Sequence, residues 1–181
     1  LLSQIRFHQE QQGQTAPLVL QGMSWGAKLA AVIAAERPEL IDGLALLYPG
    51  IKAKVKATAL QQLQLSLAER LGIRGKRVPI PLDDPTLFTA DPDWQEWIRD
   101  DPLALHEVSV AFLLANRELD RRVDAAVGQI GCPVFCQLAG QDQIIDNQAT
   151  EAYFARIRST QKTLVTCPEA RHTLEFEPNP E

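Results

Sequence analysis

Apolar and polar positions along this chain fall into blocks that predict strands and helices in turn. Residues 16–21 form a short, mostly apolar run that we interpret as a buried strand. Residues 27–37 are rich in strong helix formers and are followed by Pro38, which predicts a helix ending there. A second largely apolar strand is predicted over residues 40–49. Strands of this kind, joined by a helix, predict a parallel sheet covered on both faces.

The pattern changes over residues 51–127, where no clear buried strand is visible. Leucines at helical spacing predict a helix over residues 59–72, and residues 102–122 are typical of a further helix. Between them, an irregular stretch rich in Pro and Asp leads to Trp94 and Trp97. A crossover between neighbouring strands needs far fewer residues. We therefore predict a largely helical lid inserted between strands. Its leucines suggest an apolar acyl chain as substrate, and the alternative is that they pack against the core, as leucines at helical spacing more often do.

The sheet resumes after this insertion. Residues 132–140 predict a strand, residues 147–157 a helix, and residues 162–167 a last short strand. The sequence thus predicts two core segments with a lid between them, over residues 1–50, 128–181 and 51–127 respectively.

The turn between the first strand and its helix has the pattern G-x-S-x-G, as Gly22-Met23-Ser24-Trp25-Gly26. On a strand-to-helix turn this pattern is typical of a nucleophile elbow, whereas a turn that merely joins the two elements needs no such pattern. We expect strained backbone geometry at the serine, and collisions with the neighbouring strand and helix if Gly22 or Gly26 carried a side chain. The Ser24 hydroxyl would then be exposed at a helix N-terminus, which favours developing negative charge.

A serine hydroxyl needs an adjacent base to become a nucleophile, and the chain offers three histidines. His8 precedes the nucleophile strand, and His106 lies in the predicted lid. His172 alone follows a predicted parallel strand, at the sheet edge where active-site crevices form. We therefore predict that His172 is the base.

The base in turn needs an acid that fixes its tautomer. Asp142 and Asp146 both follow the strand that ends at Gly140. Asp146 immediately precedes a predicted helix, where Asp is a preferred N-cap, so we favour Asp142. The resulting order of serine, aspartate and histidine is that of the α/β-hydrolase triad.

These motifs resemble those of the α/β-hydrolase superfamily, and within it the group of monoacylglycerol lipases, lysophospholipases and serine aminopeptidases. The resemblance rests on the elbow and on residues 101–103, 139–146 and 170–174, and it covers essentially the whole chain. It implies a partial α/β-hydrolase fold, with a mostly parallel sheet flanked by helices. It also implies a serine hydrolase that cleaves esters through an acyl-enzyme, needs no metal or cofactor, and takes monoacylglycerol- or lysophospholipid-like substrates.

The sequence departs from this group at both ends. Family members carry earlier strands, including a His-Gly-type loop that donates one oxyanion N–H, and a closing C-terminal helix; neither is present here. Only the backbone N–H of Trp25 carries over as an oxyanion donor, and its bulky side chain would narrow the pocket. We expect a fragment of a longer enzyme, inactive or poorly soluble alone. The alternatives are a peptidase, thioesterase or acyltransferase on the same triad, or a non-catalytic binding protein.

Composition narrows the class of protein. The chain has 181 residues, 45% apolar and 23% charged, with a net charge of −5, which suits one globular domain with a lid. No basic patch indicates nucleic acid, no Lys/Arg-rich amphipathic helix indicates a membrane surface, and no transmembrane run or signal peptide is visible, so we expect a cytoplasmic protein. The spacing of Cys132, Cys136 and Cys167 predicts buried reduced thiols rather than a disulfide or metal site.

Overall fold

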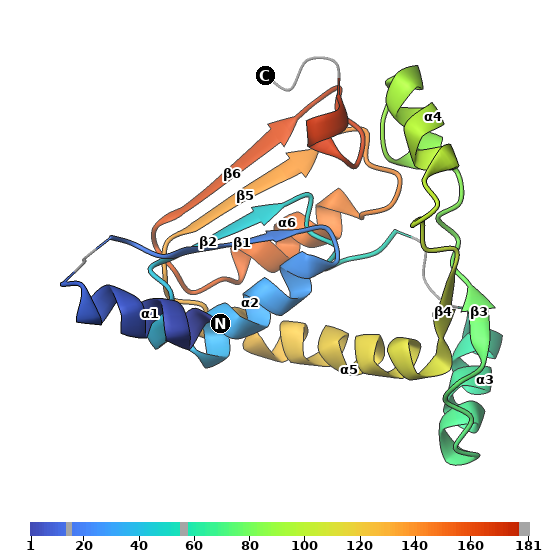
Figure 1. The fold of residues 1–181 in the computed structure, drawn as a ribbon, viewed down its shortest axis with the longest axis horizontal. Coiled ribbons are helices and arrows are strands. Elements are labelled where there is room, and N and C mark those ends of the chain that lie inside the picture. Colours follow the sequence, from blue (N-terminus) through green and yellow to red (C-terminus); the bar gives the residue numbers. More distant parts are fainter. Residues whose placement is uncertain (14–15, 55–57, 178–181) are drawn as a thin grey trace.

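The computed structural model describes residues 1–13, 16–54 and 58–177 (Figure 1). Within these ranges the core is a parallel sheet of four strands in the order β1-β2-β5-β6. Each strand overlaps a predicted one, and the α/β fold with a parallel sheet flanked by helices is confirmed. The strands are β1 (Val19–Met23), β2 (Gly43–Leu47), β5 (Val134–Ala139) and β6 (Lys162–Cys167).

The longer helices belong either to the core or to the insertion between β2 and β5. None of those in the described ranges is both long and apolar enough to cross a bilayer. The expectation that no helix closes the chain at residues 178–181 falls outside the described residues. The core helices are α1 (Leu2–Gln11), α2 (Gly26–Glu36) and α6 (Asn147–Ala155), the insertion holds α3 (Ala59–Arg70) and α4 (Pro92–Asp100), and α5 (Val110–Ala126) runs from the insertion into the core. Short 3-10 turns are η1 (Pro38–Leu40), η2 (Pro85–Leu87), η3 (Val127–Gln129) and η4 (Leu174–Phe176).

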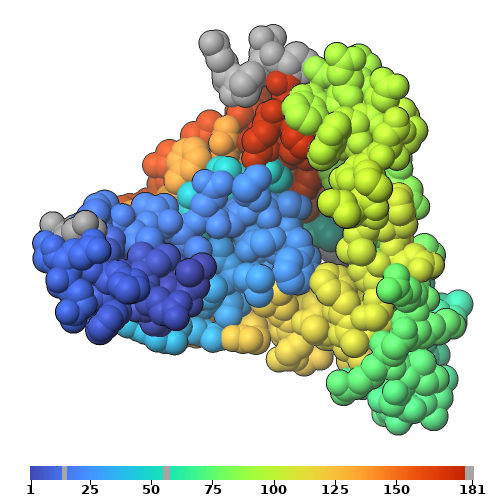
Figure 2. All heavy atoms as spheres, in the orientation of Figure 1, coloured from blue at the N-terminus to red at the C-terminus, as the bar shows by residue number. Residues whose placement is uncertain are grey.

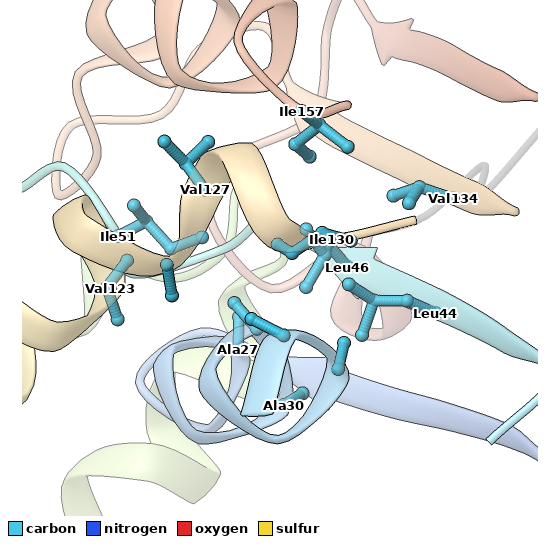
Figure 3. Packing of buried hydrophobic residues seen from close by; sticks show 14 of the residues in the cluster. Ala27, Ala30, Leu44, Leu46, Ile51, Val123, Val127, Ile130, Val134 and Ile157 are labelled. Carbon is cyan, nitrogen blue, oxygen red and sulfur yellow. The ribbon is translucent and has the colours of Figure 1, made fainter. Parts of the chain in front are cut away.

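The hydrophobic core lies on one face of the sheet. Figure 3 shows Ala27 and Ala30 of α2 beside Leu44 and Leu46 of β2, and all four side chains are buried. Alanines on this face of α2 allow a close approach of helix and sheet, which suits the close-packed interior of a protein. The same cluster continues into α5, η3 and α6, so these helices cover the same face.

The other face of the sheet is largely open in the described residues. Val19, Phe135 and Val165 point to this face from three strands and are 57%, 38% and 40% exposed. The predicted sheet covered on both faces is therefore wrong for this structure. The apolar runs correctly indicated parallel strands, but α2, α5 and α6 all pack on the same side.

The insertion contains a short antiparallel pair of strands that the sequence did not predict. β3 (Arg77–Pro79) pairs with β4 (Glu107–Ser109). The helix predicted over residues 102–122 consequently begins at Val110, where the Ser109 hydroxyl accepts the Phe112 N–H as an N-cap. β-branched Val78 and Val108 lie opposite each other in this pair, which favours a strand over a longer helix.

The two halves of α5 have different surroundings. Its second half carries the buried residues Leu119, Val123 and Ala126 and belongs to the core. Its first half faces the insertion, where α3 packs against it and projects away from the sheet (Figure 1). Of the two interpretations of the insertion leucines, packing against the core does not hold for α3. Its stripe is exposed at Leu60, Leu63, Leu67 and Leu71.

The three cysteines are free, as predicted, but only one is buried. Cys136 in β5 faces the core, and burial, with a smaller contribution from Glu151, raises the pKa of its thiol to about 12. Cys132, two residues before β5, and Cys167, at the end of β6, are half-buried, so the prediction of burial is wrong for both.

Candidate active site

The predicted elbow joins β1 directly to α2. Ser24 lies between them with φ of 45°, the left-handed region that is strained for a residue other than glycine. Its N–H donates to the Leu47 carbonyl oxygen at 3.1 Å, and its own carbonyl oxygen accepts the Gly50 N–H at 2.7 Å. The backbone of the neighbouring strand end therefore holds the serine in this strained conformation.

Only one of the two motif glycines is required by close contact. A Cβ atom on Gly22 would lie 2.6 Å from the Ala27 Cα and 2.7 Å from the Ala30 Cβ, so a side chain there would collide with α2. A Cβ on Gly26 would have no atom within 4 Å, so the expected collision at this position is wrong. Gly50, which the motif did not indicate, is the second glycine that close contact requires. A Cβ atom added there would lie 2.9 Å from the Trp25 backbone nitrogen.

The structure brings Ser24, His172 and Asp142 into one hydrogen-bonded chain. The Ser24 Oγ and His172 Nε2 are 2.8 Å apart, and the His172 Nδ1 and Asp142 Oδ2 are also 2.8 Å apart. His172 follows β6 and is 2% exposed, Asp142 follows β5 and is 4% exposed, and Ser24 is half-buried. All three lie at the carboxyl ends of parallel strands, the position at which α/β sheets bind ligands.

The partners of each atom determine the tautomer of the histidine. A carboxylate can only accept, so the His172 Nδ1 carries a proton and donates it to Asp142. The Nε2 is then free to accept the Ser24 hydroxyl proton. The second oxygen of Asp142, Oδ1, accepts the N–H groups of Ile144 and Ile145 at 2.8 and 2.9 Å, which fixes the carboxylate in its loop. This arrangement can remove the serine proton and stabilise the resulting imidazolium.

Asp146 has the capping contact that the sequence indicated. Its Oδ1 accepts the Ala149 N–H at 3.0 Å at the start of α6, and it makes no contact with His172 among the described residues. Two lysines that no motif indicated hold the same loop. The Lys54 Nζ donates to the Asp142 carbonyl oxygen, and the Lys52 carbonyl oxygen accepts the Asp146 N–H.

Two aromatic rings that the sequence did not identify surround His172. Tyr48 at the end of β2 approaches the imidazole edge-on at 5.0 Å between ring centroids, and Phe88 of the insertion does so at 6.1 Å. The Tyr48 hydroxyl donates to Glu175, three residues after His172. Burial, followed by the hydrogen bond and charge of Glu175, raises the pKa of Tyr48 above its ordinary value.

The insertion contacts the elbow through a polar cluster on α5. The Asn116 Oδ1 accepts both the Trp25 indole N–H at 2.8 Å and the Lys28 Nζ at 2.9 Å. Lys28 is buried and forms an ion pair with Asp120 at 2.5 Å. The Trp25 ring also lies 5.5 Å from the Phe112 ring, measured between centroids. The residue directly after Ser24 is therefore held by a helix that leads out of the insertion.

A second part of the insertion contacts the histidine loop, residues 168–177. We call this part, residues 85–97, the insertion strap. Thr89 is fully buried and donates to the Phe176 carbonyl oxygen at 2.7 Å, while the Arg171 guanidinium donates to the carbonyl oxygens of Thr86 and Thr89. The Trp94 ring stacks on the Phe176 ring at 4.2 Å. Figure 2 shows the molecule hollowed between the elbow region (blue) and the insertion (yellow to green).

The other two histidines lie elsewhere. His106 contacts the exposed Asp83 in the insertion, and His8 lies on α1 beside Phe7. Across the described ranges, no group of three or more His, Cys, Asp or Glu side chains is arranged to hold a metal ion.

Comparison with known proteins gives one family over nearly the whole chain. A family model described as serine aminopeptidase, S33, matches residues 1–179. Among curated proteins, monoglyceride lipase of Mus musculus is 24% identical over 162 residues, and that of Rattus norvegicus is 25% identical. Each match covers 89% of this chain and 53% of the relative, so the chain spans about half the length of these relatives.

Solved structures of lipases share the fold. A monoacylglycerol lipase of Paleococcus ferrophilus superposes with a TM-score of 0.81 at 22% identity, covering 98% of this chain and 68% of that one. A soluble variant of monoglyceride lipase from Saccharomyces cerevisiae, in complex with a substrate analogue, gives a TM-score of 0.79 at 19% identity, covering 98% and 61%.

Proposed function

Since the chain belongs to the serine aminopeptidase S33 family of α/β-hydrolases, we propose that it carries the catalytic triad of a serine hydrolase that cleaves carboxylic esters. The observation that carries this proposal is the hydrogen-bonded chain from Ser24 through His172 to Asp142. A strained serine at a helix N-terminus, a base within 2.8 Å and a buried acid behind that base meet the geometric requirements of nucleophilic acyl transfer.

The mechanism follows from the position of each atom. The Ser24 Oγ attacks the carbonyl carbon of the ester while the His172 Nε2 takes its proton, and Asp142 stabilises the imidazolium. Collapse of the tetrahedral intermediate expels the alcohol, which receives the proton from His172. Water then attacks the acyl-enzyme and gives a proton to His172. As the second tetrahedral intermediate collapses, the bond from the acyl carbon to the Ser24 Oγ breaks, His172 returns the proton to that oxygen, and the acid product leaves.

The negative oxygen of the tetrahedral intermediate needs hydrogen-bond donors. We propose the backbone N–H of Trp25 as one of them, because it follows Ser24 at the first turn of α2, where the helix dipole favours negative charge. Gly50 supports this assignment, since any side chain there would crowd the Trp25 nitrogen.

We propose a lipid ester of the monoacylglycerol type as the substrate, and residues 51–127 as a lid over the site. The named activity of the curated relatives supports the substrate class. The exposed leucine stripe of α3 supports a lid that meets apolar molecules, because large apolar side chains in a row are uncommon on a protein surface without a binding role. The contacts of α5 with the elbow and of the insertion strap with the histidine loop also support this proposal.

Labelling by a fluorophosphonate, located by mass spectrometry, tests the reaction class. We expect the label on Ser24, and its loss in both Ser24→Ala and His172→Ala. A folded protein that takes no label would contradict the hydrolase proposal. A panel of monoacylglycerols, lysophospholipids, thioesters and peptide amides then tests the substrate class, and faster cleavage of peptide amides than of esters would overturn the lipid assignment.

A further inference from the structure

The turn that ends β2 touches both reacting residues of the proposed triad. As described above, the Leu47 carbonyl oxygen accepts the Ser24 N–H, and the Gly50 N–H donates to the Ser24 carbonyl oxygen. Between these two contacts lies Tyr48, whose ring faces His172. One turn of four residues therefore contacts the backbone of the nucleophile and the side chain of the base.

Tyr48 is held in an unusual conformation. Its φ is 34°, in the left-handed region, which a bulky side chain rarely adopts. It is 3% exposed, and its N–H donates to the Gln137 carbonyl oxygen of β5 at 2.7 Å. Such a conformation persists only where the surroundings over-determine it, and it is found most often at functional sites.

The Tyr48 hydroxyl connects this turn to the histidine loop. It lies 2.9 and 2.8 Å from the two carboxylate oxygens of Glu175, in the turn η4 that follows His172. The loop that carries the base is thus tied to the same turn that fixes the backbone of Ser24.

Resting on the hydrolase function proposed above, we propose that Tyr48 is a positioning residue for the reaction. Its ring and its hydrogen bond to Glu175 hold the His172 imidazole at hydrogen-bonding distance from the Ser24 Oγ. In this role Tyr48 acts through His172 and not on the substrate. The distance matters because a displacement of about 1 Å can cost roughly 100-fold in rate.

The alternative is that Tyr48 has only a packing role in the protein interior. Tyr153 offers a matched control, because it is also buried and its hydroxyl lies 3.4 Å from the Val123 carbonyl oxygen, within the main core cluster to which Tyr48 does not belong. Replacing either tyrosine by Phe removes the same atom from a buried ring. Only Tyr48→Phe breaks a contact with the histidine loop.

The first experiment compares Tyr48→Phe with Tyr153→Phe by ester kinetics and fluorophosphonate labelling. We expect Tyr48→Phe to lower kcat and the labelling rate about tenfold or more with KM unchanged, and Tyr153→Phe to leave both rates as in the wild type. Glu175→Gln keeps an acceptor for the hydroxyl and should retain most of the rate, whereas Glu175→Leu should resemble Tyr48→Phe. The double variant Tyr48→Phe/Glu175→Leu should be no slower than either single variant, since both remove one interaction.

A readout independent of turnover separates this inference from the hydrolase proposal. The low-field proton resonance of the His172 Nδ1–H should broaden or shift in Tyr48→Phe and stay unchanged in Tyr153→Phe. A wild type that takes no label would overturn the hydrolase function, while the resonance still decides whether Tyr48 orders the imidazole. Unchanged rates and an unchanged resonance in folded Tyr48→Phe would overturn the positioning role and leave Tyr48 as a core residue.

Discussion

The nucleophile elbow and the histidine loop are both parts of the candidate site, but they are held in different ways. Ser24 is fixed by backbone hydrogen bonds and by the absence of side chains at Gly22 and Gly50. His172 is fixed mainly by side chains from distant parts of the chain. A site residue that is held by backbone contacts leaves a local pattern in the sequence, whereas one that is held by side chains from distant segments does not.

The insertion contacts both regions, and the two contacts also differ. At the elbow, α5 reaches the side chains of Trp25 and Lys28 and leaves the backbone of the turn alone. At the histidine loop, the insertion strap bonds the loop backbone itself, since Thr173 donates its N–H to the Phe88 carbonyl oxygen at 2.8 Å. A movement of the insertion should therefore disturb His172 more than Ser24.

The largest effect is expected where the histidine loop meets Asp142. Asp142→Asn should lower kcat about 10⁴-fold with little change in stability, because an amide no longer fixes the productive tautomer of His172. Asp146→Asn makes the same chemical change four residues later and should leave kcat as it is, because Asn caps a helix as well as Asp. Ester kinetics and thermal unfolding measure both. Equal losses of kcat in the two variants would contradict the assignment of Asp142.

The elbow offers a matched pair of glycines. Gly22→Ala should destabilise the protein by about 1–3 kcal/mol and reduce labelling of Ser24, because its Cβ overlaps α2. Gly26→Ala, in open space at the start of α2, should be neutral or stabilising by up to about 1 kcal/mol. Urea unfolding measures the free-energy changes. A larger loss for Gly26→Ala than for Gly22→Ala would mean that the elbow is not held by its contact with α2.

The position of the elbow could be predicted from the sequence because the elements that build it are neighbours in the chain. Strand, serine turn and helix are consecutive, so Ser24 could be placed from its neighbours alone. The choice of Asp142 over Asp146 used only local capping chemistry, and the structure agrees on where both side chains lie. The catalytic roles of Ser24, Asp142 and His172 stay predictions.

What the sequence missed depends on contacts between distant segments. Tyr48 and Phe88 reach His172 from 124 and 84 residues earlier in the chain, and no period or motif marks them. The leucines of α3 have the spacing of a packed helix, but spacing alone does not say what faces them, and they are exposed. The Pro-Gly pair at the end of a predicted strand was the one local signal that could have indicated Gly50.

A smaller effect is expected at the centre of the insertion strap. Thr89→Val keeps the shape of the buried side chain but leaves the Phe176 carbonyl oxygen and the Asp91 N–H without their partner, which should cost about 1–3 kcal/mol. We also expect slower labelling of Ser24, because the histidine loop loosens. Thr150→Val is the control: Thr150 is equally buried, and its hydroxyl bonds the Asp146 carbonyl oxygen, which the Thr150 N–H also reaches. Equal labelling rates in the two variants would contradict a role of the insertion strap in ordering the candidate site.

The smallest effect is expected at the outer end of the strap, where Trp94 stacks on Phe176. Trp94→Leu removes a stacked aromatic pair and should lower the free energy of unfolding by about 0.5–1.5 kcal/mol, beyond the loss from the buried area. Trp97→Leu should cost less, because Trp97 meets the same ring edge-on at 6.1 Å and is 54% exposed. Hydrogen exchange at the Thr173 amide reports the strap directly, since this N–H is bonded to Phe88. Faster exchange in Trp94→Leu, with the Ser24 amide unchanged, would show that the histidine loop responds to the insertion while the elbow does not. Equal acceleration at both amides would mean that the two regions open together.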